Sequence, residues 1–150
     1  MRPVYENSTT LAAEDRLASK LSDQWSCKTT KLGRKYKVDY ALSRGGVIYA
    51  WAELKKRNIP SNRYSEYMLS LDKYLTAQTL AQQTDTKCLL VVEFSDCVLY
   101  ADLATVKFRL GMGGRKDRGD PEDYEPCCWM PLDQFKEINF TDITAEMEAL

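Results

Sequence analysis

The segment DYALSRGGVIYAWAELK, residues 39–55, decides the fold. Two apolar runs flank the turn signal Arg44-Gly45-Gly46, and the second run is rich in β-branched and aromatic residues, so the segment predicts a β-hairpin. Asp39 begins the first run, and Glu53 and Lys55 end the second. These charges belong either to the solvated face of a hairpin or to an active site.

The register of this hairpin determines where the aspartate lies. Side chains alternate along a strand, so one face of the second run is predicted to carry Val47, Tyr49, Trp51, Glu53 and Lys55. A two-residue turn at Gly45-Gly46 would set Asp39 opposite Ala52. An odd or bulged connection would set it opposite Glu53, with the two Cβ atoms ~5 Å apart. We expect the second arrangement.

Two carboxylates at that separation repel each other unless a cation lies between them. A hard divalent ion such as Mg²⁺ suits such a pair, because it prefers oxygen ligands. Lys55, two residues beyond Glu53, would point at the same place. Two acids and a lysine can serve phosphodiester hydrolysis, which needs a cation on the phosphate and an activated water.

The composition excludes several other kinds of chemistry. The chain has 150 residues and no histidine, which excludes Ser-His-Asp and Cys-His catalysis and ordinary zinc sites. Five scattered cysteines fit a reducing compartment better than a disulfide framework. No apolar run approaches the ~18 residues needed to cross a bilayer, and the first residues lack the plan of a signal peptide. We therefore expect one domain over residues 1–150, a cytoplasmic location and no membrane contact.

The charge of the chain is unevenly distributed. Of 21 Lys and Arg and 22 Asp and Glu, residues 1–63 hold 13 basic and 6 acidic side chains, which leaves 8 and 16 for residues 64–150. The basic half indicates a polyanionic partner such as nucleic acid. Alternatively, the two halves pack together and neutralise each other.

The remaining sequence predicts a sheet with helices on it. We expect a helix within 7–25, two strands or one bent strand in 26–43, a long amphipathic helix over 63–84 and a hairpin of 87–94 and 97–103. A short strand at 106–110 is followed by a polar glycine-rich loop, 111–126, and by a strand and turn at 127–138. This order predicts an α/β or α+β fold, a mixed central sheet flanked by helices.

Asp39 followed by Glu53-Leu54-Lys55 resembles the D…ExK signature of the PD-(D/E)XK nuclease superfamily, of restriction-endonuclease-like fold. The expected elements match its α-β-β-β-α-β core order over residues 8–101, and the small resolvase-like and phage-encoded members look closest. Val38 stands where the proline of the signature would be.

The resemblance implies a set of functional residues. Asp39, Glu53 and the backbone carbonyl of Leu54 would bind Mg²⁺ or Mn²⁺, and Lys55 would position or deprotonate the attacking water. An acid on the first helix often joins them in such proteins; Glu14 fits best, and Glu6 and Asp15 fit less well. On the second helix, Ser70, Lys73 and Gln78 are candidates to face the scissile phosphate.

Basic residues beside this site predict a contact with the nucleic acid backbone. The candidates are Lys31, Arg34, Lys35, Lys37, Lys56 and Arg57. An ordinary lysine-rich edge strand is the alternative interpretation of residues 28–37. In the 111–126 loop, Arg115 and Arg118 could touch the backbone, although a solvated loop with locally paired charges is the stronger interpretation.

The sequence thus predicts a Mg²⁺-dependent nuclease that hydrolyses phosphodiester bonds of branched or double-stranded DNA. It would act in recombination, repair or genome processing, in the host cytoplasm if phage-encoded, and a homodimer would supply two active sites. The alternative functions are a non-catalytic nucleic-acid-binding protein that keeps the nuclease fold, and an inhibitor or assembly protein that binds a protein partner.

Overall fold

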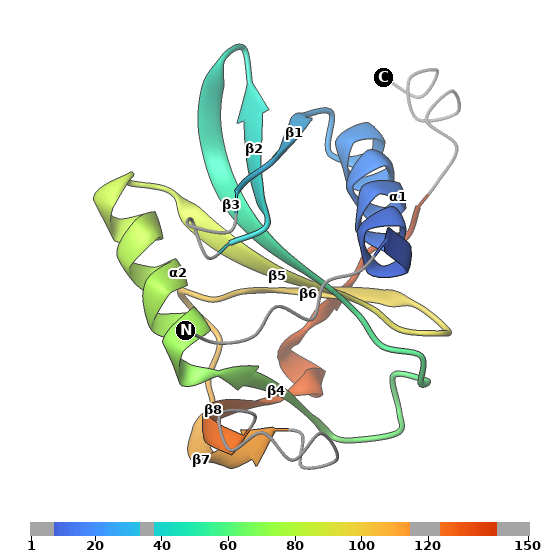
Figure 1. Cartoon of the computed structure of the whole chain (residues 1–150), viewed down its shortest axis with the longest axis vertical. Coiled ribbons are helices and arrows are strands. Elements are labelled where there is room, and N and C mark those ends of the chain that lie inside the picture. The colour runs from blue at the N-terminus through green and yellow to red at the C-terminus, as the bar shows by residue number, and fades with distance from the viewer. Residues whose placement is uncertain (1–7, 34–37, 115–123, 141–150) are drawn as a thin grey trace.

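The computed structural model describes residues 8–33, 38–114 and 124–140. Two helices and nine strands follow one another along this part of the chain (Figure 1). They are α1 (Ser8–Gln24), β1 (Lys28–Lys31), β2 (Tyr40–Arg44), β3 (Val47–Lys56), β4 (Glu66–Ser70), α2 (Leu71–Gln83), β5 (Lys87–Glu93), β6 (Val98–Asp102), β7 (Arg109–Gly114), β8 (Tyr124–Pro131) and β9 (Lys136–Glu137), with a short 3₁₀ turn, η3 (Leu132–Gln134), between the last two strands.

The central sheet is mixed, with strand order β1-β2-β3-β5-β6-β9. Strands β3 and β5 are parallel, and the other neighbours are antiparallel. A parallel pair needs a crossover connection, which here contains β4 and α2. The predicted fold class, a mixed sheet flanked by helices, is confirmed.

The two helices cover opposite faces of this sheet (Figure 1). Leu17, Ala18 and Leu21 of α1 belong to one buried cluster, together with Leu54 of β3. Ala77 and Ala81 of α2 belong to the other, which includes Trp51. Because β3 has clusters on both sides, its residues from Ala50 to Leu54 are all buried. A charged side chain in that stretch is therefore in the core, not on a wet face.

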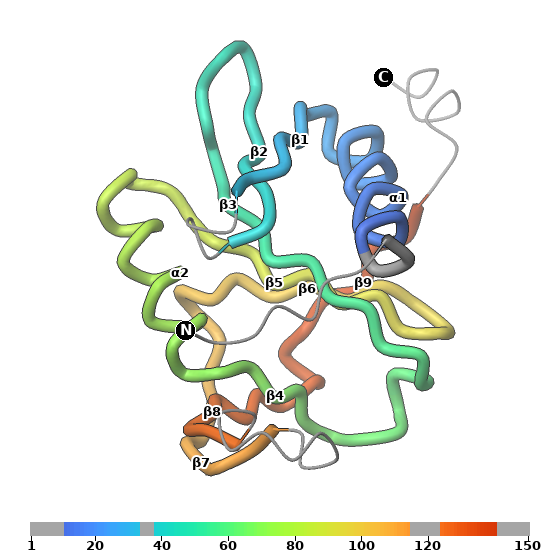
Figure 2. The backbone as a smooth tube through the Cα atoms, in the orientation of Figure 1, coloured from blue at the N-terminus to red at the C-terminus, as the bar shows by residue number. Residues whose placement is uncertain are grey.

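A second sheet, β4-β8-β7, lies at the α2 side of the molecule, as the backbone trace also shows (Figure 2). Tyr67 and Leu69 of β4 and Cys128 and Met130 of β8 turn one face of it into the core cluster that contains α2. The opposite face carries the alternate residues, among them Met68 and Trp129, which are only half-buried.

Two predicted elements are wrong in type over part of their length, and a third begins later than predicted. The helix predicted over 63–84 begins at Leu71, because residues 66–70 pair with β8 as strand β4 and Ser70 caps the helix. The segment predicted as a loop, 111–126, contains most of β7 and the start of β8, which pair from Arg109↔Trp129 to Gly114↔Tyr124. The first error arises because β4 pairs with a strand more than fifty residues away, which local periodicity does not show. The second arises because the pairing of β7 with β8 overrides the glycines and charged residues that predicted a loop. The strand predicted at 106–110 begins only at Arg109.

The hairpin of β2 and β3 combines a tight turn with a bulge. Arg44 pairs with Val47 across Gly45-Gly46, whose φ angles of +56° and +80° suit the type I′ turn that glycine favours. The register then shifts between Leu42↔Ala50 and Ser43↔Ile48, so that Tyr49 has no paired residue opposite it on β2. The bulge also breaks the predicted alternation, because Tyr49 packs with the α1-side cluster and not with Trp51.

Candidate active site

The bulge decides the position of Asp39. On the far side of the bulge from the turn, Tyr40 pairs with Ala52. Asp39, the residue directly before β2, therefore lies opposite Glu53. Oδ2 of Asp39 accepts a hydrogen bond of 2.8 Å from the backbone N–H of Leu54. The structure thus places Asp39 beside Glu53, as the bulged register predicts, although the turn itself has two residues.

The carboxyl group of Asp39 is held in an unfavourable environment for its charged form. Burial is the largest cause, and the negative charges of Glu53 and Glu14 add to it. Lys55 and the hydrogen bond from Leu54 act in the opposite direction but do not cancel these effects. Together these effects raise the pKa of Asp39 to about 6. A bound cation would remove this penalty.

Glu53 is the buried charge at the centre of the site. Only 3% of the residue is exposed. Its Oε1 contacts Nζ of Lys55 at 3.0 Å and Nζ of Lys73 at 2.5 Å. Burial by itself raises the pKa of Glu53, but the two lysines outweigh it and bring the pKa below its ordinary value. Its second oxygen, Oε2, is buried and has no hydrogen-bond partner among the described residues.

Lys55 stays protonated in this arrangement. Burial lowers the pKa of Lys55, whereas the charges of Glu53 and Asp39 raise it, and the net pKa lies above the ordinary value. The ammonium group is thus a donor of hydrogen bonds and positive charge.

Glu14 of α1 and Lys31 of β1 complete the cluster. Nζ of Lys31 lies 2.6 Å from Oε2 of Glu14 and 3.9 Å from Oδ1 of Asp39. The predicted helix acid is therefore close enough to raise the pKa of Asp39. Asp15 instead accepts a hydrogen bond of 3.1 Å from the hydroxyl of Tyr40. Glu6 lies outside the described residues.

The carboxylates of Asp39, Glu53 and Glu14 are suitable ligands for a hard divalent cation, but they do not by themselves complete a coordination sphere. Carboxylate oxygens are the ligands that Mg²⁺ and Mn²⁺ prefer, and a buried oxygen without a partner is the expected mark of a missing positive group. Within residues 8–33, 38–114 and 124–140, no three Asp, Glu, Cys or His side chains converge at metal-binding distance. Mg²⁺ characteristically binds through one or two carboxylates and fills its remaining positions with water and phosphate oxygens.

The predicted nucleic-acid contacts divide into three groups. Lys31 and Lys73 lie in the acidic cluster, paired with Glu14 and Glu53. Lys56 ends β3, with its Nζ 3.7 Å from a carboxylate oxygen of Glu93, and Arg57 follows it and donates a hydrogen bond of 3.0 Å to the hydroxyl of Tyr67. Arg34, Lys35, Lys37, Arg115 and Arg118 lie outside the described residues.

The candidates on the second helix have different positions. The hydroxyl of Ser70 accepts a hydrogen bond of 3.1 Å from the backbone N–H of Lys73 and caps α2 beside the site. The side-chain amide of Gln78 donates to the hydroxyl of Tyr74 and to the backbone carbonyl of Leu103, directly after β6. These two hydrogen bonds hold α2 to the end of β6.

Tyr67 is a neighbour of the site that the sequence did not single out. Burial raises the pKa of Tyr67 to about 12; Arg57 lowers it and Glu53 raises it further. Its hydroxyl thus remains protonated and accepts the hydrogen bond from Arg57. The structure shows alternating buried and half-buried residues over 66–70, but the sequence of this segment has no apolar–polar alternation that would have identified the strand and its inward tyrosine.

Comparisons with known proteins identify the fold and the family of this chain. The fold is similar to that of Hjc from Archaeoglobus fulgidus, a Holliday junction resolvase from an archaeal hyperthermophile, with a TM-score of 0.59 and 13% sequence identity over 87% of this chain and 93% of that one. No curated protein matches the sequence. Within the described residues, no helix is both long and apolar enough to cross a membrane.

A family model of phage proteins, described as PDDEXK endonucleases, matches residues 1–138. This range contains Asp39, Glu53 and Lys55, the residues on which the resemblance rested. The chain belongs to the phage PDDEXK endonuclease family.

Proposed function

We propose that this protein is a divalent-metal-dependent deoxyribonuclease that cleaves branched or broken DNA. The single observation that carries the proposal is the pair of carboxylates at the bulged hairpin. Asp39 and Glu53 lie close enough to perturb each other, and a buried oxygen of Glu53 has no partner among the described residues. Family membership supports endonuclease chemistry at this pair.

Asp39 and Glu53 would hold the metal, with the backbone carbonyl of Leu54 and the carboxylate of Glu14 as further ligands. Mg²⁺ or Mn²⁺ in this position would supply positive charge to the phosphate and lower the pKa of water. The hydrogen bond from Leu54 leaves Oδ1 of Asp39 for this role.

Lys55 and Lys73 would supply positive charge to the scissile phosphate. Both ammonium groups lie against Oε1 of Glu53, which supports a role in binding the scissile phosphate and orienting the attacking water. Because its pKa is raised, Lys55 in this state suits charge stabilisation better than proton abstraction.

The basic segment Lys55-Lys56-Arg57 supports a DNA backbone running along β3. Similarity to the fold of a Holliday junction resolvase favours branched substrates, such as four-way junctions and flaps. Work on such DNA during phage recombination, repair or genome processing would take place in the host cytoplasm, and a homodimer would present two sites to two strands.

Cleavage assays test this proposal directly. The purified protein is incubated with a four-way junction, a flap, a duplex with an overhang, a blunt duplex, a single strand and a matched RNA duplex, each with Mg²⁺, Mn²⁺ or EDTA. We expect metal-dependent cutting of at least one DNA substrate. Glu53→Gln and Asp39→Asn should each lower the rate by about 10²–10⁴-fold, since they remove the ligands.

Glu137→Gln is the matched control, because β9 is at the other edge of the central sheet from β1 and β2. It should cut at the wild-type rate. Absence of cutting on every substrate with both ions would contradict the enzyme proposal. DNA binding under those conditions would then identify the non-catalytic alternative.

A further inference from the structure

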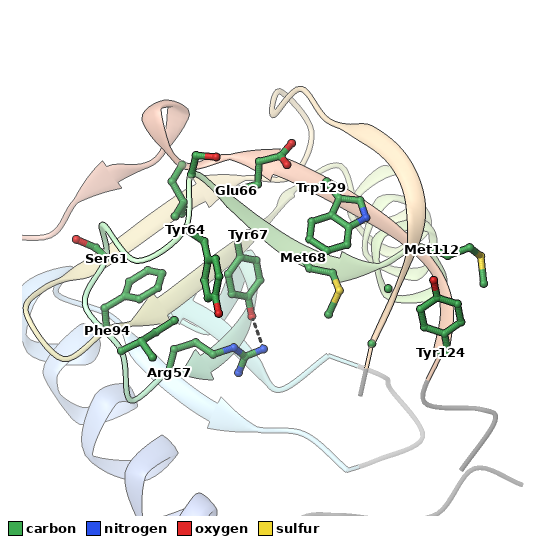
Figure 3. A pocket seen from close by; sticks show the side chains of 15 residues that line it. Arg57, Ser61, Tyr64, Glu66, Tyr67, Met68, Phe94, Met112, Tyr124 and Trp129 are labelled. Atoms are coloured by element: carbon green, nitrogen blue, oxygen red, sulfur yellow. Dashed lines mark hydrogen bonds between the residues drawn. The ribbon is translucent and has the colours of Figure 1, made fainter. Parts of the chain in front are cut away.

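A cavity of about 590 Å³ lies next to the site, between the β3–β4 connection and the second sheet. Figure 3 shows the rings of Tyr64 and Tyr67 on one side of it and those of Trp129 and Tyr124 on the other, with Met68 between them. Its volume is in the range of pockets that take a ligand of drug or nucleotide size. The predicted active-site residues do not line it.

The indole of Trp129 lies against β7 at one side of this cavity. Its Nε1 donates to the backbone carbonyl of Gly111 at 3.2 Å, and the guanidinium of Arg109 lies 5.1 Å from the ring centroid. A Cβ on Gly113 would come within 2.8 Å of the indole, so only glycine permits this close approach. The tryptophan thus has one face supported by β7.

The wall that carries Tyr64 is also held in place. Ser61 donates from both its backbone N–H and its hydroxyl to the carboxylate of Asp96, at 2.8 Å each. The carbonyl of Ser65 accepts a hydrogen bond of 2.9 Å from the N–H of Leu132. These hydrogen bonds hold the backbone on both sides of Tyr64, whose side chain is 62% exposed and therefore open to a ligand. A preformed aromatic wall lowers the entropic cost of binding.

The charge around the cavity favours an anionic chain. Arg57 lines it; this residue directly follows the end of β3, two positions beyond Lys55 and four beyond Glu53. The carboxylate at the rim, Glu66, is neutralised by Arg109, with contacts of 2.9 and 3.1 Å. No other Asp or Glu lines the cavity among the described residues.

The distance to the active site fits a short run of nucleotides. Arg57 is four positions beyond Glu53 and directly follows the end of β3, which at the rise of a strand corresponds to about 13 Å. At about 3.4 Å per stacked nucleotide this is at most about four nucleotides, and fewer in an unstacked strand. A strand whose phosphate lies at Lys55 therefore reaches Arg57, which lines the cavity.

We infer that this cavity binds an unpaired nucleobase of the DNA strand whose backbone lies at the active site, by stacking on Tyr64 and Trp129. The inference rests on the proposed function and narrows its substrate class to DNA with unpaired nucleotides within about four positions of the cleaved phosphate. Aromatic rings next to basic side chains are the usual platform for single-stranded nucleic acid.

Binding assays without divalent metal test the cavity separately from catalysis. Fluorescence anisotropy in EDTA compares a duplex carrying a single-stranded overhang with a blunt duplex of equal length. Tyr64→Ala should weaken binding to the overhang about tenfold, as expected for loss of one stacked base, and change blunt-duplex binding less than about twofold. Tyr64→Phe keeps the ring and should bind like the wild type.

Leu110→Ala is the matched control: it removes an equally exposed side chain, 63% exposed, from β7, a strand that borders the cavity, and Leu110 itself does not line the cavity. It should leave both affinities unchanged. Because Tyr64 is largely exposed, its replacement should also leave the thermal unfolding midpoint unchanged, which separates loss of stacking from loss of fold.

A second readout locates the base. The fluorescent base 2-aminopurine, placed in turn at each of the overhang positions, should be quenched by the protein at one or two adjacent positions, and Tyr64→Ala should remove that quenching. Equal affinity of wild type and Tyr64→Ala for the overhang, or the absence of any quenched position, would overturn the inference. If the protein cleaves DNA but shows either of those results, the proposed nuclease function stands and the base-binding inference fails. If a position is quenched but no DNA is cleaved, base binding in the cavity stands and the nuclease function fails.

Discussion

The backbone N–H of Leu54 donates to Oδ2 of Asp39 at 2.8 Å, across a hairpin whose two-residue turn alone would set Asp39 opposite Ala52. The unpaired Tyr49 makes the difference, because one extra residue in β3 reverses the face on which every earlier residue of β2 lies. The carboxylate pair therefore depends on a bulge four residues before Glu53.

Asp39→Asn should stabilise the metal-free protein. The pKa of Asp39 rises from its ordinary 3.8 to about 6 on folding, so the folded state binds the proton more tightly and the charged carboxylate opposes folding above that pH. We expect the free energy of unfolding of the variant to exceed that of the wild type by about 1–3 kcal/mol at pH 8. Urea unfolding in EDTA measures it, and the difference should shrink toward zero as the pH falls to about 4.

Glu53→Gln should have the opposite effect. The lysines bring the pKa of Glu53 below its ordinary value, so its charge stabilises the fold above about pH 4.5, and this is lost as the pH falls through the lower folded value. Glutamine leaves Lys55 and Lys73 without their partner. We expect a loss of about 1–3 kcal/mol at pH 7, less than for a fully buried pair because Lys73 is partly exposed. An equally stable variant in urea unfolding would show that the pair has no net effect.

Metal binding should stabilise the wild type but not Glu53→Gln. A cation that binds only the folded state at ten times its dissociation constant adds about 1.4 kcal/mol. Thermal unfolding with increasing Mn²⁺ measures this, with EDTA as the baseline. The effect should be larger at pH 8 than at pH 5.5, because Asp39 is largely protonated below its raised pKa. The same midpoint shift in Glu53→Gln would place the cation elsewhere.

Ser70 should act on the site through its helix cap. Its hydroxyl accepts the N–H of Lys73, so Ser70→Ala should cost about 1 kcal/mol of stability, and Ser70→Asp should keep the cap and the stability. Circular dichroism melting curves compare the three proteins. If alanine and aspartate variants melt together, the cap does not contribute and a direct role at the phosphate becomes the better explanation.

Gly113→Ala tests the support beneath Trp129. The added Cβ would meet the sulfur of Met68 at 2.4 Å and the indole at 2.8 Å, so we expect a loss of about 1–3 kcal/mol in urea unfolding. Gly33→Ala is the matched control, because no atom of the described residues lies within 4 Å of the added Cβ there. Equal stabilities of the two variants would mean that Met68 and Trp129 move aside without cost.

Some of the structure follows directly from local pattern. The run from Val47 to Lys56 is β-branched and aromatic, which specifies a strand, and its two-residue periodicity sets Glu53 and Lys55 on one side. The glycine pair at 45 and 46 specifies the tight turn by its positive φ angles. By contrast, residues 66–70 have helical spacing in sequence yet pair with β8 more than fifty residues later.

The amino-acid sequence by itself determined which chemical groups this protein could use: carboxylates and lysines without histidine, an aspartate before one strand and a glutamate and lysine within the next. Only the tertiary structure decided the side on which Asp39 lies, the partners of Lys31 and Lys73, and the cavity beside Arg57. The physical reason is that residue type and periodicity are local, whereas register, ion pairing and cavity shape arise from contacts between segments far apart in the chain.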